Sequence, residues 1–161
     1  MSTDLTNQYL TFYLDNEQYA LRVGRVREVL EMVEPSRLPH MPSYMEGVIN
    51  VRDAVLPVVD MRRRLRLSEG ERTIDTAIVV MELSDTKKSV GCLVDAVDAV
   101  VEIEPSQIEP APQIGTAVNS AYLEGIAKRD GDTFVMLLDP DALFGAEDLD
   151  YSARQDARSA G

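Results

Sequence analysis

The chain contains an internal repeat. Three stretches recur in the same order: residues 29–36 and 100–106, residues 44–48 (YMEGV) and 122–126 (YLEGI), and residues 56–60 and 135–139. The separation between the copies drifts from 71 to 79 residues, so the copies differ in loop length while their elements persist. A repeat of strand-rich units of this length predicts two similar small β-lobes packed together.

Short alternations of apolar and polar residues, separated by turn residues, are typical of β-strands. We expect strands at residues 10–14, 19–23, 47–51, 54–60, 76–83, 89–94, 96–103, 123–128 and 133–138. Within residues 24–31 we expect a helical turn that leads into a further strand. A short helix is expected at residues 61–67, and a helical turn capped by Asp139 at residues 139–145. This pattern indicates an all-β fold with few short helices, and five strands per lobe closing into a barrel would leave no exposed edge.

The net charge and the single cysteine restrict the functions open to the chain. A formal charge of −12 argues against nucleic acid or an anionic membrane surface as a partner, because both are bound through excess cations. Cys92 is the only cysteine, which excludes an internal disulfide and disfavours a zinc site. No signal peptide is visible, and no apolar stretch approaches the roughly 20 residues that span a bilayer. We therefore expect a cytoplasmic protein.

Residues that could carry catalysis or bind a metal are few. His40, the single histidine, lies in a proline-rich loop, and the chain has no Gly-x-Ser-x-Gly elbow. Residues 75–77 (DTA) faintly resemble the aspartic protease motif, but alanine replaces the glycine and no second triplet exists. Asp139 and Asp141 offer two carboxylates, whereas calcium usually takes six or more oxygens. A hydrolase and a small-ligand or ion-binding β-protein stay open as alternatives to a protein that binds other proteins.

Two charged features are candidates for contacting a partner. The basic run at residues 62–66 (RRRLR) is either a solvated helix face or a docking site for an acidic partner. Glu28 is expected at the end of the short helical turn, and Arg52 at the tip of the hairpin formed by residues 47–51 and 54–60. In a small barrel this tip can fold over the turn, so that the carboxylate and the guanidinium form a bidentate pair in a groove wall. The alternative is two independent surface charges.

These motifs together resemble the CheW family of chemotaxis adaptors. The resemblance is carried by residues 19–29 (YALRVGRVREV), 38–39, 42–52 (PSYMEGVINVR), 57–62 (PVVDMR), 91–97, 122–125 and 137–139. It extends over about residues 8–145, which we expect to form one CheW-like domain. The polar segment at residues 68–73 suggests a first lobe at about 8–67 and a second at about 74–145, with strand exchange between them left open. Residues 146–161 are expected to form a flexible tail.

The resemblance implies two SH3-like five-stranded β-barrels, no enzymatic activity and no cofactor. It implies an adaptor that couples the cytoplasmic tips of chemoreceptors to the regulatory domain of the histidine kinase CheA, in arrays on the cytoplasmic side of the membrane. Further copies of the adaptor could join such arrays as parts of rings. The positions that would line the receptor-facing groove are Val26, Glu28 and Arg52, with Val100 from the second lobe.

One residue departs from the family pattern. The family usually has glycine after its Asn-x-Arg motif, and this chain has Asp53 there. Glycine adopts positive φ freely, whereas aspartate does so at a cost of about 1 kcal/mol. We therefore expect the hairpin tip to bend differently, which leaves the direction of Arg52 open.

Overall fold

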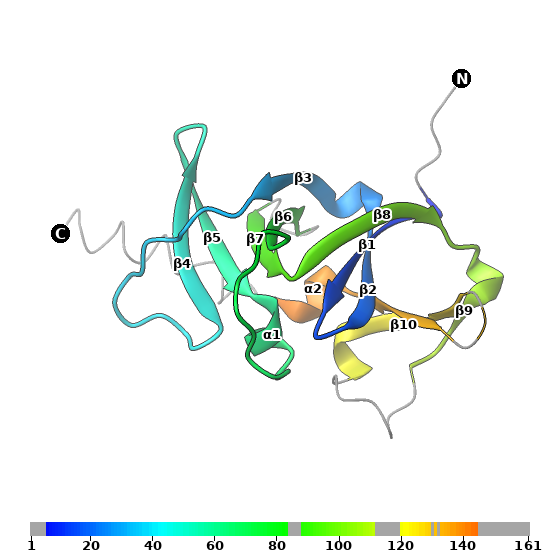
Figure 1. Ribbon diagram of the computed structural model, residues 1–161. Helices are drawn as coiled ribbons and strands as arrows, with labels where there is room; N and C mark the ends of the chain where they lie inside the picture. The colour runs from blue at the N-terminus through cyan, green and yellow to red at the C-terminus, as the bar shows by residue number, and fades with distance from the viewer. Residues whose placement is uncertain (1–5, 84–87, 112–119, 130, 132, 145–161) are drawn as a thin grey trace.

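Two β-sheets contain the strands of a computed structural model that describes residues 6–83, 88–111, 120–129, 131 and 133–144 (Figure 1). The strands are β1 (Gln8–Leu14), β2 (Glu17–Arg22), β3 (Val26–Glu31), β4 (Met45–Val51), β5 (Ala54–Asp60), β6 (Ala77–Glu82), β7 (Ser89–Val94), β8 (Ala96–Glu102), β9 (Ile108–Glu109), β10 (Leu123–Lys128) and β11 (Phe134–Leu138). The helical segments are η1 (Val23–Arg25), α1 (Met61–Arg64), η2 (Pro105–Gln107), η3 (Ser120–Tyr122) and α2 (Pro140–Leu143). The expected all-β fold with few short helices is confirmed.

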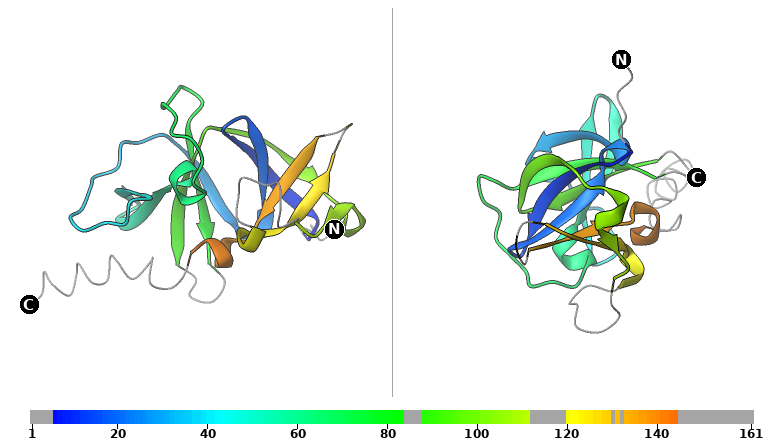
Figure 2. Two further views of the ribbon diagram at one scale, coloured as in Figure 1. Left: turned by 90° about the horizontal axis from the view of Figure 1, so that it is seen from below. Right: turned by 90° about the vertical axis from the view of Figure 1, so that its right-hand side faces the viewer.

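Each sheet curls into a small SH3-like barrel, and Figure 2 shows the two groups of strands side by side. Barrel A has the strand order β8-β1-β2-β11-β10-β9, and barrel B has the order β3-β6-β7-β5-β4. In barrel B the segment after β3 returns to β4 through two hydrogen bonds of 2.9 Å between the backbones of Ser36 and Val48. In barrel A, β9 follows β8 and η2 and pairs with β10.

The strands of the two barrels come from both halves of the sequence. The first two strands of the chain lie in barrel A together with β8 to β11, while β3 to β7 form barrel B. The chain therefore crosses between the two barrels twice, after β2 and after β7. The lobe boundaries at about 8–67 and 74–145 stay a prediction, and the expected tail at 146–161 lies outside the described residues.

The strand registers of the two barrels match, as the repeat predicts. β5 pairs in parallel with β7, and β11 pairs in parallel with β2 at the equivalent position. The hairpins β4–β5 and β10–β11 each carry an irregularity next to the glycine of the repeated motif. The pairs β3–β6 and β8–β1 each carry another irregularity at the same place in the repeat. The repeat therefore extends beyond the order of the strands to their pairing.

Alternating side chains on each strand serve two different cores, as expected for a period of two. In β5, Val58 lies in the core of barrel B, and the next residue, Val59, lies in a larger core shared by both barrels. In β11, Leu137 lies in the core of barrel A, and Leu138 lies in the shared core. Because both barrels contribute to one packed cluster, they are held together as one body.

The glycines of the repeated motif lie where another segment passes close to the hairpin. Gly47 has a φ of +150°, and a Cβ there would lie 2.4 Å from the carbonyl oxygen of Ser36. A Cβ at Gly125 would lie 2.7 Å from the carbonyl oxygen of Glu109. These two carbonyls belong to the segments that close the two barrels, so glycine at this point of the repeat permits closure.

A short helix follows each repeated hairpin, and an aspartate and a tyrosine of the repeat hold its start in place. The N–H of Asp60 donates to the carbonyl of Tyr44, and that of Asp139 donates to the carbonyl of Tyr122, both at 2.9 Å. Each aspartate side chain also accepts two backbone N–H groups of the helix that follows. The capped turn at Asp139 is confirmed, whereas α1 is shorter than the expected 61–67.

Arg64, at the end of α1, joins the two copies of the repeat. Its guanidinium lies 4.8 Å from the ring centre of Tyr44 and 5.0 Å from that of Tyr122, the two tyrosines of the repeated motif. It also lies 6.0 Å from the ring of Phe144, and its Nε donates to the carbonyl of Leu143 at 2.7 Å. Leu143 ends α2 as Arg64 ends α1, so this contact lies where the two copies meet.

We expect Gly47→Ala and Gly125→Ala each to lower the free energy of unfolding by about 1–3 kcal/mol, because the new methyl group overlaps a backbone carbonyl. Urea denaturation of the purified variants measures this loss. Gly24→Ala is the matched control, since a Cβ at Gly24 meets nothing within 4 Å. Losses no larger than that of the control would contradict the closure role of the repeated glycines.

We expect Arg64→Met to lower the free energy of unfolding by about 1–2 kcal/mol, because it removes a partly desolvated cation from between aromatic rings. Arg64→Lys keeps the charge but loses the planar group and the Nε donor, so its loss should be intermediate. Thermal unfolding at constant pH measures both, with Arg66→Met at an exposed position as the control. A variant Arg64→Met as stable as the parent would contradict the joining role.

Candidate partner-binding site

The structure brings Glu28 and Arg52 together, although Glu28 is not where the sequence predicted it. The helical turn η1 ends at Arg25, and Glu28 lies within β3 rather than at the end of the turn. The reason is local: the N–H of Val26 caps η1 by donating to the carbonyl of Val23, and pairing with β6 then extends the chain.

Arg52 reaches Glu28 from the tip of the β4–β5 hairpin. Its Nη1 donates to Oε1 of Glu28 at 3.2 Å, and its Nη2 donates to Oε2. The pair is bidentate, so the alternative of two independent charges is wrong. The side chain of Arg52 is 73% exposed and that of Glu28 only 25% exposed. The hydrogen bond to Glu28 raises the pKa of Arg52.

Asp53 lies in the left-handed region of backbone conformation, which glycine adopts freely. Arg52 has a φ of 48° and Asp53 a φ of 65°. Two consecutive left-handed residues are the signature of the type I′ turn that matches the twist of a hairpin. The turn directs Arg52 toward β3, which resolves the direction that the sequence left open.

The two predicted valines lie in different surroundings. Val26 is half-buried at the start of β3, where it pairs with Met81 and packs against the shared core. Val100 lies on β8 in barrel A and is 56% exposed. Val100 therefore lies on a different barrel from the Glu28–Arg52 pair.

The sequence reasoning missed Val29. It follows Glu28 on β3 and is 45% exposed. Val29 pairs with Val79 on β6, and Val100 pairs with Leu10 on β1, at the same place in the repeat. Aligning residues 29–36 with 100–106 was the signal that could have identified Val29 as the counterpart of Val100.

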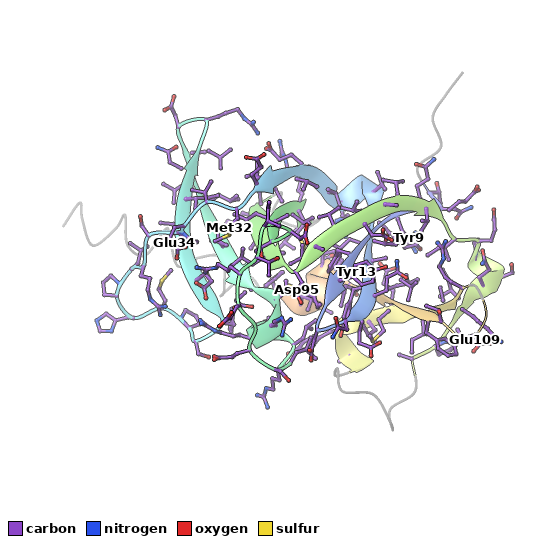
Figure 3. All side chains as sticks on the ribbon, viewed as in Figure 1. Tyr9, Tyr13, Met32, Glu34, Asp95 and Glu109 are labelled. Carbon is purple, nitrogen blue, oxygen red and sulfur yellow. The ribbon has the colours of Figure 1, made fainter. Side chains whose placement is uncertain are left out.

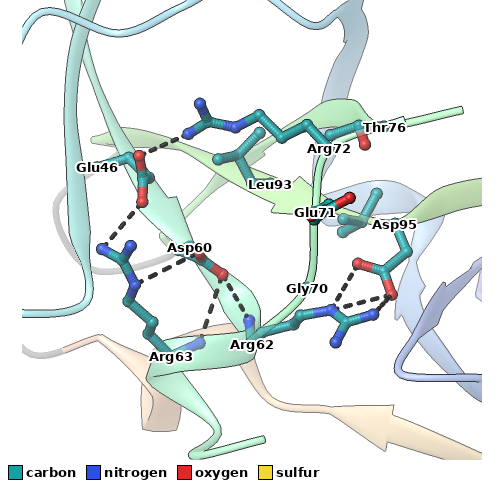
Figure 4. A pocket seen from close by; sticks show the side chains of 11 residues that line it. Glu46, Asp60, Arg62, Arg63, Gly70, Glu71, Arg72, Thr76, Leu93 and Asp95 are labelled. Carbon is teal, nitrogen blue, oxygen red and sulfur yellow. Dashed lines mark hydrogen bonds and ion pairs between the residues drawn. The ribbon is translucent and has the colours of Figure 1, made fainter. Parts of the chain in front are cut away.

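A polar pocket of about 380 Å³ lies beside α1 (Figure 4). It is lined by Glu46, Asp60, Arg62, Arg63, Gly70, Glu71, Arg72, Thr76, Leu93, Val94 and Asp95. The side chain of Glu46 is only 8% exposed and lies 2.9 Å from Nη1 of Arg63 and 2.6 Å from Nη2 of Arg72. Burial raises the pKa of the Asp60 carboxyl, while the hydrogen bond from the N–H of Arg63 and the charge of Arg63 oppose that rise. Glu46, Asp60 and Asp95 each pair with an arginine of the pocket, which is typical of a structural network.

We expect Glu46→Ala to lower the free energy of unfolding by about 3 kcal/mol, because it leaves two partly buried guanidinium groups without their shared carboxylate. Glu69→Ala is the control, since Glu69 is 83% exposed and lies 3.8 Å from Arg63. Urea denaturation of both variants measures the difference. Equal losses in the two variants would contradict a structural role of the network.

The residues considered for catalysis or metal binding lie in surroundings that give them no such role. His40 is exposed in its loop, and burial raises the pKa of the Cys92 thiol well above its usual range, which keeps it protonated. Asp139 caps α2, and Asp141 pairs with Arg25 at 2.8 Å. In the described ranges there is neither a group of three or more potential metal ligands nor a helix long and apolar enough to cross a membrane.

Comparison with known proteins places the chain in a family. A family model described as the CheW-like domain matches residues 8–148. The chain belongs to this family. The family resemblance predicted from the sequence motifs is confirmed.

Individual CheW proteins match along most of their length. The chain is 31% identical to the chemotaxis protein CheW of Rhizobium meliloti (strain 1021), over 89% of this chain and 93% of that protein. It is 32% identical to the chemotaxis protein CheW of Bacillus subtilis (strain 168), over 86% of each. The crystal structure of the scaffolding protein TtCheW from Thermoanaerobacter tengcongensis superposes with a TM-score of 0.81 at 31% identity, over 91% of this chain and 92% of that chain.

CheW-like proteins are scaffolds and adaptors rather than enzymes. The chain is accordingly a non-enzymatic adaptor of chemotaxis-type signal transduction. Membership of this family counts against the hydrolase alternative.

Proposed function

We propose that the chain couples the cytoplasmic tip of a chemoreceptor to the regulatory domain of the histidine kinase CheA, in cytoplasmic arrays at the membrane. In this proposal Val26, Glu28, Arg52 and Val100 contact the receptor. The observation that carries the proposal is the bidentate Glu28–Arg52 pair, which ties the hairpin tip to β3 at the surface of barrel B.

The surroundings of this pair suit a helical partner. A helix docks on a surface through apolar side chains on one face, with polar groups that set its orientation. The strands that adjoin the pair also carry exposed apolar side chains: Val29 is 45% exposed on β3, and Val55 is 62% exposed on β5. Arg52 gives two hydrogen bonds to Glu28, and a guanidinium has five N–H donors in all, so it can also bind a partner.

The shared core supports coupling between two partners. An adaptor transmits a signal only when its contacts with each partner differ between two states of the assembly. Because both barrels are packed on one core, a displacement at the receptor-facing strands is passed to the other barrel. The regulatory domain of the kinase and further copies of the adaptor are the proposed partners at the remaining surfaces.

The basic test is a pair of binding measurements. The purified chain is expected to bind a receptor-tip fragment and, separately, the regulatory domain of CheA, as measured by isothermal titration calorimetry. Binding to neither fragment would contradict the proposed function.

We expect Glu28→Lys and Arg52→Glu each to weaken binding to the receptor-tip fragment about tenfold, because one member of a charge pair is lost at the interface. Calorimetry measures the affinity, and circular dichroism checks that the fold is intact. Arg22→Glu is the matched control, since Arg22 is also part of an exposed ion pair, with Glu124 at 3.0 Å in barrel A. Unchanged affinity in both test variants would contradict the assigned surface.

A further inference from the structure

Two ion pairs occupy corresponding places in the repeat, within one residue, with their charges exchanged. Arg62 and Asp141 are the second residues of α1 and α2. Arg62 pairs with Asp95, which lies where the chain crosses from barrel B to barrel A between β7 and β8. Asp141 pairs with Arg25, which lies where the chain crosses from barrel A to barrel B between β2 and β3. The helix residue is thus a cation in one copy and an anion in the other.

We call each of these two ion pairs, with the backbone contacts of its residues, a clasp. The Arg62–Asp95 clasp connects α1 of barrel B to barrel A. Nε of Arg62 donates to Oδ1 of Asp95 at 2.9 Å. Asp95 also accepts the N–H of Asp15 at 2.8 Å, and its own N–H donates to the carbonyl of Tyr13 at 3.0 Å. Asp15 and Tyr13 belong to the β1–β2 hairpin of barrel A, and Figure 3 shows Asp95 near the middle of the molecule.

The Arg25–Asp141 clasp connects α2 of barrel A to barrel B. Nη2 of Arg25 lies 2.8 Å from Oδ1 of Asp141, and its Nη1 donates to Oδ2 at 3.3 Å. Nε of Arg25 donates to the carbonyl of Glu82, at the end of β6, at 2.9 Å. Glu82 and Tyr13 have the same place in the repeat, so both clasps reach the corresponding strand of the opposite barrel.

Both clasps lie at the starting ends of the strands that carry the proposed receptor surface. Arg25 directly precedes β3, which holds Val26 and Glu28, and Asp95 directly precedes β8, which holds Val100. The side chains of the four clasp residues are between 18% and 39% exposed. Ion pairs that are this shielded from water are screened less by salt than fully exposed ones.

We infer that Arg62, Asp95, Arg25 and Asp141 are positioning residues, whose two clasps hold β3 and β8 at a fixed separation. The helix residue is a cation in α1 and an anion in α2, so each helix finds an opposite charge only in the segment that it contacts. Pairing α1 with Arg25, or α2 with Asp95, would bring like charges together. The link to receptor binding rests on the proposed function. The separation of the two strands is a property of the chain alone.

Exchanging the two helix residues tests the inference without altering the net charge. The variant R62D/D141R places two carboxylates in one clasp and two guanidinium groups in the other. Spin labels on Val29→Cys and Val100→Cys, both exposed positions, report the distance between β3 and β8 by pulsed electron paramagnetic resonance. We expect a broader distance distribution than in the labelled parent. Adding R25D and D95R restores opposite charges in both clasps, so the distance distribution should become narrow again.

The control exchanges an ion pair that lies within one barrel. Arg27 on β3 pairs with Glu82 on β6 at 2.9 Å, so R27E/E82R should leave the distribution unchanged. If circular dichroism shows that R62D/D141R does not fold, the same distance measurement is made on the milder variants R62Q and D141N. A distribution that is unchanged in the exchange variant, or in both milder variants, would overturn the inference, as would a lack of narrowing in the fourfold variant.

Receptor binding is measured separately, on chains without spin labels. If the parent binds the receptor-tip fragment, R62D/D141R should bind about fivefold more weakly or worse, within the range of couplings carried by packed elements. The fourfold variant should regain the parent's affinity. A parent that does not bind the fragment contradicts the proposed function, while the distance measurement still decides whether the clasps hold the strands.

Discussion

The guanidinium of Arg64 lies at the point where the two copies of the repeat meet, and the arrangement of the barrels depends on this contact. It packs between Tyr44 and Tyr122 and donates to Leu143. A repeat alone would produce two barrels with no defined relation. One cation between the equivalent tyrosines, above a core that both barrels share, makes them a single body. The proposed receptor surface is held in place by that body.

Charged residues in this chain have two different surroundings. Around α1, carboxylates and guanidinium groups are half-buried and satisfy one another, as Glu46 does with Arg63 and Arg72. At the hairpin tip, the Glu28–Arg52 pair stays accessible, with Arg52 largely exposed. A half-buried network of paired charges is suited to holding a shape, whereas an exposed ion pair is suited to orienting a partner. Both surroundings fit an adaptor.

Local pattern predicted much of this structure because strand periodicity and turn chemistry act over a few residues. The strand expected at residues 10–14 and the Asp139 cap were both found, and the Glu28–Arg52 contact was foreseen from the position of the hairpin tip. One position was wrong because a distant contact decided it. Glu28 was placed one element too early, because spacing alone does not separate a helical turn from the start of a strand, and pairing with β6 decided the matter.

By itself, the sequence determined the all-β class, the twofold repeat and the family, since these follow from periodicity and from motifs that are read along the chain. Tertiary structure alone decided which strands share a barrel, because β1 and β2 pair with strands that lie far away in sequence. It also decided that Arg62 meets Asp95 and that Arg25 meets Asp141. Contacts between distant residues depend on how two barrels pack in space, and no local pattern along the chain encodes that packing.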